Sequence, residues 1–135
     1  MAEGWEKKLA EKAGRFVLKK EGKGLADFSL VLLSPDKMRA VNKKYRAKDC
    51  PTDVLSFEGL DILICPEVVK ENAKKFAVSY KQELCRAAIH GALHFLGYDH
   101  EKTAKGAKEM REKEEQYLQE FKLKTRRLSP WALSS

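Results

Sequence analysis

The segment HGALHFLGYDH, residues 90–100, holds all three histidines of the chain. His90 and His94 lie four positions apart in an apolar pattern that predicts a helix, so both rings project from one face. Gly97 ends that helix and tolerates a positive φ, so the chain can turn back and bring His100 to the same point. Three imidazoles then converge on one metal ion, and three protein ligands leave a position for water, as in catalytic zinc sites.

The same histidines have two other interpretations, which their spacing disfavours. A single histidine beside an apolar helix face is usually a packed residue, whereas three at i, i+4 and i+10 with a glycine at the bend favour metal binding. A purely structural metal would ordinarily take a fourth protein ligand. Cys85 lies about 140° around the helix from His90 and therefore points elsewhere. We predict one metal ion per chain, for which zinc is the best fit and nickel or cobalt would also serve.

The spacing is similar to the HExxHxxGxxH motif of the zinc endopeptidases called metzincins. Gly91 stands where those proteases carry the glutamate that acts as general base, which counts against peptide hydrolysis by their mechanism. Glycine inside a helix also costs about 1 kcal/mol relative to alanine. Gly91 therefore indicates either close packing at this point or space for a bulky substrate, and a metallopeptidase is the less favoured enzyme class.

Outside this stretch, helices and strands are mixed without strict alternation, which predicts an α+β fold. We expect a small mixed sheet of three to four strands packed with about five helices. The predicted strand at 27–33 is apolar on both faces at its end, so we expect it inside the sheet. The predicted helices cover residues 5–20, 35–45, 66–76, 80–96 and 103–121, and the predicted strands cover residues 27–33, 54–58 and 61–65.

Length and composition bound the organisation of the chain. With 135 residues and 43% hydrophobic residues, we predict one metal-dependent hydrolase domain over residues 1–123, followed by a flexible basic tail over residues 124–135. No apolar run approaches the roughly 18 residues that span a bilayer. Three cysteines without a CxxC pair predict ordinary thiols in a reducing cytoplasm rather than a disulfide framework.

The charge of the chain points to an anionic partner or simply to solubility. The net charge is +7, and the basic residues concentrate in the two ends of the sequence while the middle is slightly acidic. A basic rim around a less basic centre suits RNA or an anionic lipid surface. Charge alone does not separate such a partner from plain solubility.

Three sequence blocks together resemble the YbeY family. The stretch at 90–100 is similar to its metal motif, NKKYRAKDCPTDVLSF at 42–57 to a second signature, and DILICP at 61–66 to the strand and helix start that follow. The resemblance covers residues 28 to about 120. It implies a zincin-like fold and a single-strand-specific endoribonuclease that acts in rRNA maturation and ribosome assembly or quality control. It also implies association with the small ribosomal subunit. We expect no membrane partner, because no apolar run is long enough to span a bilayer.

The chain departs from the family pattern in two places. The family opens with a strand before its first helix, and we find no such strand at the start of this sequence. The connection between Phe57 and Asp61 is short, with Glu58 at a position where the family has proline. These departures concern the sheet and its hairpin and leave the histidines unaffected.

Two polar residues of the second block are candidates for the site. The resemblance implies that Arg46 takes part in catalysis, where its planar guanidinium would clamp a phosphate and stabilise developing charge. The alternative for Arg46 is a surface residue at the end of a helix. Asp53 either orients a histidine through its second ring nitrogen or caps a turn.

These observations favour a metal-dependent endoribonuclease with His90, His94 and His100 as ligands and Arg46 as the catalytic side chain. A bound zinc lowers the pKa of its water toward about 7, which makes that water one candidate nucleophile. A ribose 2′-hydroxyl of the RNA is the other candidate. A non-enzymatic assembly factor of the small subunit, with a structural metal, is the main alternative.

Overall fold

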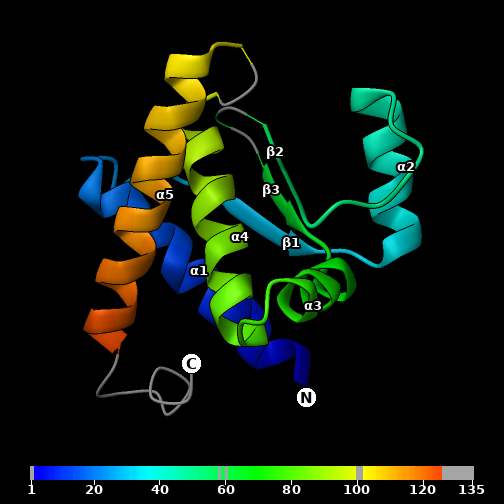
Figure 1. Cartoon of the computed structure of the whole chain (residues 1–135), viewed down its shortest axis with the longest axis horizontal. Coiled ribbons are helices and arrows are strands. Elements are labelled where there is room, and N and C mark those ends of the chain that lie inside the picture. The colour runs from blue at the N-terminus through cyan, green and yellow to red at the C-terminus, as the bar shows by residue number, and fades with distance from the viewer. Residues whose placement is uncertain (1, 58, 60, 100–101, 126–135) are drawn as a thin grey trace.

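The computed structural model describes residues 2–57, 59, 61–99 and 102–125 of the chain. In these residues five helices accompany one small sheet, which confirms the predicted α+β class. Figure 1 shows the arrangement, with helices on both sides of the sheet. The helices are α1 (Ala2–Lys20), α2 (Pro35–Arg46), α3 (Pro66–Lys75), α4 (Tyr80–Phe95) and α5 (Ala104–Thr125), and the strands are β1 (Ser29–Leu32), β2 (Val54–Ser56) and β3 (Asp61–Ile64).

The three strands form a mixed sheet in the order β1-β3-β2. The central strand β3 runs parallel to β1, with Leu30 opposite Ile62, and antiparallel to β2, with Val54 opposite Ile64. The prediction that residues 27–33 form an interior strand is wrong, because β1 lies at an edge of the described sheet. Its two-sided apolar pattern arises because Leu32 and Leu33 pack into different clusters on opposite faces.

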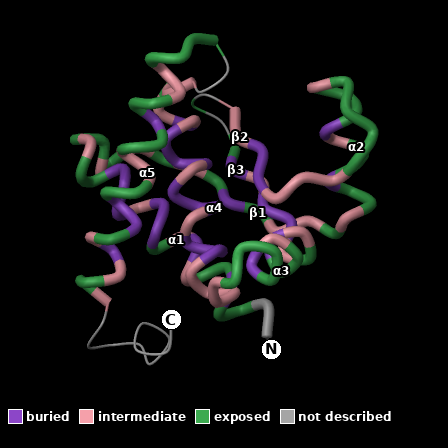
Figure 2. The backbone as a smooth tube through the Cα atoms, in the orientation of Figure 1, coloured by how far each residue is buried: buried purple, intermediate pink, exposed green. Residues whose placement is uncertain are grey.

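The larger core lies on the face of the sheet that α4 and α1 cover. Ile62 and Ile64 of β3 are fully buried there, together with Leu93 of α4 and Val17 of α1. On the opposite face, Met38 of α2 packs in a smaller cluster with residues of β2 and β3. Figure 2 shows the buried backbone concentrated in α4 and the strands, so α4 is the most enclosed helix of the fold.

Side-chain caps fix where three of the helices begin. The hydroxyl of Ser34 accepts a hydrogen bond from the Lys37 N–H at 3.4 Å, and that of Ser79 accepts one from Gln82 at 3.1 Å. Thr103 does the same for α5, at 2.9 Å from the N–H of residue 106. These caps satisfy backbone donors that the first helical turn leaves without intrahelical partners.

The C-terminal end of α4 is held by the turn that the sequence predicts at Gly97. Gly97 has a φ of +99°, a left-handed conformation that favours glycine, and its N–H donates to the His94 carbonyl at 2.9 Å. The N–H of Gly59, in the connection between β2 and β3, donates to the Phe95 carbonyl at 3.0 Å. The hairpin is therefore tied to the end of α4 that carries His94.

The last helix extends further than the sequence predicts. Residues 124 and 125 belong to α5, so the predicted tail at 124–135 starts after Thr125 at the earliest, and residues 126–135 lie outside the described residues. Within the described residues, no helix combines the length and the apolar character needed to cross a bilayer.

Two of the three free cysteines, Cys65 and Cys85, are buried, and Cys50 is exposed. Burial raises the pKa of the Cys85 thiol to about 12, as expected for a packed and unreactive side chain.

Candidate active site

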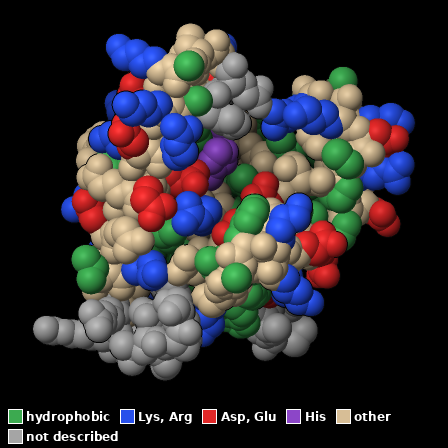
Figure 3. Space-filling model, in the orientation of Figure 1, with side chains coloured by type: hydrophobic (Ala, Val, Ile, Leu, Met, Phe, Trp, Pro, Cys, Tyr) green, Lys and Arg blue, Asp and Glu red, His purple; other side chains and the backbone are tan. Residues whose placement is uncertain are grey.

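A hollow of about 250 Å³ lies where α4 packs against β2, and we call it the histidine cleft. Figure 3 shows histidine side chains reaching the surface in a recess flanked by basic and acidic side chains. The cleft is lined by Arg46, Val54, Leu55, Ser56, Phe57, His90, Gly91, His94 and Asp99. The structure therefore brings Arg46 of α2 to the same hollow as the two histidines of α4.

His90 and His94 lie on one face of α4, as their spacing predicts. Their ring centroids are 4.9 Å apart, and the rings are inclined by 70° to each other. Both side chains are half-buried. The third predicted ligand, His100, lies outside the described residues. Within the described part of the chain, no group of three or more His, Cys, Asp or Glu side chains is gathered as a metal site.

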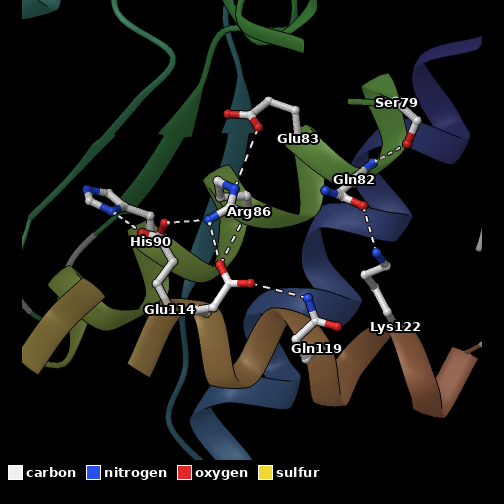
Figure 4. A network of polar contacts seen from close by, with 9 residues as sticks. Ser79, Gln82, Glu83, Arg86, His90, Glu114, Gln119 and Lys122 are labelled. Atoms are coloured by element: carbon white, nitrogen blue, oxygen red, sulfur yellow. Dashed lines mark hydrogen bonds and ion pairs between the residues drawn. The ribbon is translucent and has the colours of Figure 1, made fainter. Parts of the chain in front are cut away.

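A carboxylate from α5 holds the His90 ring. Oε1 of Glu114 lies 2.6 Å from Nδ1 of His90, as Figure 4 shows. A metal-ligating histidine characteristically donates its other ring N–H to a carboxylate, which fixes the tautomer and the ring orientation. Because this contact uses Nδ1, His90 would bind a metal through Nε2. The donor set of the cleft therefore fits a metal that prefers imidazole.

Glu114 is in turn held by Arg86 of α4. Nη1 of Arg86 lies 3.1 Å from Oε2 of Glu114 (Figure 4). Nη2 of Arg86 lies 3.4 Å from Oε2 of Glu115. Burial alone would raise the pKa of Glu114. The hydrogen bond to His90 and the Arg86 guanidinium outweigh that effect, so the pKa is below its usual value. Glu114 thus offers His90 a carboxylate at neutral pH.

A second hollow of about 240 Å³ adjoins the histidine cleft and shares Arg46, Val54 and His90 with it. Glu83 of α4 lines this hollow and is 4% exposed, with the Arg86 Nε at 3.7 Å from its carboxylate. Burial raises the pKa of Glu83 to about 7; the Arg86 charge opposes the shift, and the charges of Asp53 and Glu114 add to it.

We expect the free energy of unfolding of Glu83→Gln, compared with that of wild type, to be higher at pH 8 than at pH 5. The pKa of Glu83 is raised from 4.5 to about 7, so the folded chain binds more protons than the unfolded chain between these values. Wild-type stability therefore falls as pH rises through this window, by on the order of 2 kcal/mol, and the glutamine variant lacks that loss.

Urea unfolding of both proteins at pH 5 and pH 8 measures this difference. Glu115→Gln is the matched control, because the Glu115 side chain is 55% exposed and also contacts Arg86. A Glu83→Gln effect that is the same at both pH values would contradict the prediction.

Asp53 caps a turn, which is one of its two predicted roles. Its Oδ1 accepts hydrogen bonds from the Val54 N–H at 2.9 Å and from the Thr52 hydroxyl at 3.3 Å. Glu114 is instead the carboxylate that contacts the His90 ring at Nδ1. No pattern in the sequence marks this role, because Glu114 lies 24 residues beyond His90 in a helix of mixed charge.

Gly91 allows α4 to lie directly on the sheet. A Cβ atom at this position would be 2.7 Å from Cγ2 of Ile62 and 3.1 Å from Cγ2 of Val54. The Ser56 hydroxyl also donates to the Gly91 carbonyl at 2.8 Å, which joins β2 to α4. Close packing is therefore one reason for glycine inside this helix.

The turn after α4 is anchored by Glu21, a residue that sequence reasoning did not single out. The Tyr98 hydroxyl donates to Glu21 Oε1 at 2.7 Å, the Tyr117 hydroxyl donates to the other oxygen, and the Lys113 ammonium lies 3.4 Å away. Burial would raise the pKa of Glu21, but the two tyrosines and Lys113 hold it below its usual value. This network fixes the chain two residues before His100.

Comparisons with known proteins identify the family of the chain. The family model described as Endoribonuclease YbeY matches residues 2–122. A Thermotoga neapolitana relative is 43% identical over 119 residues, covering 84% of this chain and 78% of the relative. A Bacillus velezensis relative is 36% identical over 133 residues, covering 84% of each chain. The solution structure of TM1509 from Thermotoga maritima superposes with a TM-score of 0.67 at 35% identity, covering 93% of this chain and 88% of that one. The chain therefore belongs to the YbeY family.

Proposed function

We propose that the chain is a metal-dependent endoribonuclease for single-stranded RNA that acts in rRNA maturation and in ribosome assembly or quality control. The observation that carries the proposal is the histidine cleft, where His90 and His94 share one hollow with Arg46 and Glu114 holds His90. The relatives from Thermotoga neapolitana and Bacillus velezensis are both named Endoribonuclease YbeY. Family membership over residues 2–122 supports the same activity for this chain.

The proposed metal ligands are His90, His94 and His100, and the proposed ion is a single zinc, with nickel or cobalt as alternatives. The contact between His90 Nδ1 and Glu114 supports this assignment, because it leaves ligation to Nε2. When bound, the ion supplies Lewis acidity toward a phosphodiester and lowers the pKa of a water.

The chain's own residues would bind and orient the scissile phosphodiester. The Arg46 guanidinium would donate to non-bridging phosphate oxygens and stabilise the charge that grows on them as the attacking oxygen approaches phosphorus. The bond to the attacking oxygen, from water or from a ribose 2′-hydroxyl, forms as the bond to the leaving oxygen breaks. The hydrogen bond between Ser56 and Gly91 keeps the two walls of the cleft in register.

Arg46→Ala is expected to lower the single-turnover cleavage rate by about 10²-fold, because it removes donors that face the developing charge. Arg46→Lys should recover part of the rate, since it keeps the charge but loses the planar fork. Arg39→Ala on the same helix is the control, because the Arg39 guanidinium is held by Asp49 at 2.7 Å outside the cleft. Equal rates for Arg46→Ala and wild type would mark Arg46 as a helix-end surface residue.

The proposed activity can be tested with pure protein on matched substrates. We expect cleavage of an unstructured RNA, little cleavage of the same sequence in a duplex, and none of an unstructured peptide panel. Chelation should abolish cleavage, and zinc should restore it. Cleavage of peptides but not RNA would favour a metallopeptidase. Tight ribosome binding without cleavage of any substrate would favour the assembly-factor alternative.

The proposed partners are single-stranded RNA, rRNA above all, and the small ribosomal subunit, and the proposed location is the cytoplasm. The net charge of +7 supports an RNA partner, because Lys and Arg side chains bind phosphates and release counterions. Cosedimentation with small subunits over a range of salt concentrations tests the ribosomal partner.

A further inference from the structure

A third hollow, about 640 Å³ in volume, lies between α1 and the C-terminal end of α5, and we call it the basic groove. It is larger than the histidine cleft and shares none of the residues that line the cleft. Its size is within the range of ligand-binding pockets. Glu114, which holds His90, and Lys124, which lines the groove, lie ten residues apart on α5, or roughly 15 Å along the helix.

Five cationic side chains surround this groove. Four of them, Lys8, Lys12, Arg15 and Lys19, recur at helical spacing along one face of α1, and Lys124 comes from α5. Glu11 is the carboxylate in its lining among the described residues. Such an array attracts an anion, and its length along the helix suits an extended polyanion better than a compact one.

Aromatic rings also line the basic groove, and the Arg15 guanidinium lies over one of them. The Arg15 guanidinium carbon is 4.7 Å from the centroid of the Phe28 ring. The Arg15 Nη1 also donates to the carbonyls of Gly24 at 2.9 Å and Ala26 at 2.7 Å, so its plane is fixed. The Lys124 ammonium lies 5.3 Å from the Phe16 ring centroid. A fixed guanidinium plane is a surface on which an unstacked nucleobase can stack.

We infer that the basic groove binds a second segment of single-stranded RNA, with phosphates on its lysines and a base on the Arg15–Phe28 pair. The choice of RNA over other polyanions rests on the proposed function. Cations in a row beside a fixed stacking surface are what single-strand binding grooves combine. The groove would hold the RNA strand away from the cleft and raise the affinity of long substrates over short ones.

The test removes three exposed groove charges, in the variant Lys12→Gln/Lys19→Gln/Lys124→Gln. The control variant Lys70→Gln/Lys74→Gln/Lys75→Gln removes the same charge from exposed lysines of α3, outside the groove. Fluorescence anisotropy with an unstructured RNA of about 20 nucleotides measures affinity, which does not depend on cleavage. We expect the groove variant to bind at least about tenfold more weakly, with a salt slope reduced by about 2, and the control to change by less than about twofold.

Equal losses in both variants would overturn the inference, since they would reflect net charge alone. Unchanged RNA binding by the groove variant would also overturn it, as would a loss of binding confined to polyglutamate or to anionic phosphatidylserine vesicles. The affinity readout separates this inference from the proposed function. If the protein binds RNA through the groove but cleaves no RNA, the groove inference stands and the proposed endoribonuclease activity is contradicted.

Discussion

Replacing His90 and His94 together with alanine is expected to empty the proposed metal site and to reduce RNA cleavage by at least about 10³-fold. The two rings lie 4.9 Å apart on one face of α4, so removal of both leaves too few donors to retain the ion. Loss of the ion removes several kcal/mol of transition-state stabilisation, which corresponds to a loss of this size. RNA affinity should stay within a few-fold of wild type, because lysines and arginines outside the cleft carry phosphate binding.

Plasma mass spectrometry on protein purified without an affinity tag provides a readout that does not depend on activity. We expect about one zinc per wild-type chain and none in the double variant. Circular dichroism before and after thermal unfolding shows whether the variant still folds. A native chain that binds no metal even after reconstitution would contradict the site. If the double variant loses both the metal and its affinity for RNA, the metal instead has a role in folding.

A substitution at Glu114, the carboxylate that contacts His90, should weaken metal binding without abolishing it. Glu114→Gln keeps a side chain of similar shape near Nδ1 but removes the charge, and such partners typically affect metal affinity by 10- to 100-fold. Glu115→Gln, on the next residue of α5 and largely exposed, is the matched control. Equal metal affinities in the two variants would show that Glu114 has only a structural role.

The parts of the site that lie on α4 could be predicted because their signals are local. The spacing of His90 and His94 depends only on helical geometry, and Gly97 marks the end of the same helix. Glu114 could not be predicted, because it comes from a different helix in which acidic and basic residues are mixed. No local pattern separates that carboxylate from its solvated neighbours until α5 is packed against α4.

The fold follows the same division between local and long-range information. Caps at Ser34, Ser79 and Thr103 predict where helices begin because each bond joins residues three apart. The edge position of β1 depends on which strands lie beside it in the sheet. An apolar pattern on both faces of a strand indicates only that both faces are covered, so it does not distinguish an edge strand from a central one. The sequence could not decide between packing and substrate space at Gly91 for a similar reason, because the atoms of Ile62 and Val54 lie far away in the chain.

Gly91→Ala is the second change for which we expect a large effect, a loss of about 1–3 kcal/mol in the free energy of unfolding. Alanine is the better helix former by about 1 kcal/mol, so propensity alone predicts the opposite sign. The added Cβ would lie 2.7 Å from Ile62 Cγ2, and the side chains of a buried strand cannot move aside without shifting the sheet. Urea unfolding measures the difference.

Gly4→Ala separates packing from propensity, because a Cβ at Gly4 of α1 meets nothing within 4 Å. That variant should be unchanged or slightly stabilised. In an Ile62→Ala background the atom that a Cβ at residue 91 would strike is gone, so Gly91→Ala should then cost much less than in wild type. If Gly91→Ala costs the same in both backgrounds, contact with Ile62 is not the cause of the loss. If it costs nothing in either, glycine is not required for packing, and space for a substrate in the histidine cleft becomes the reason for its presence.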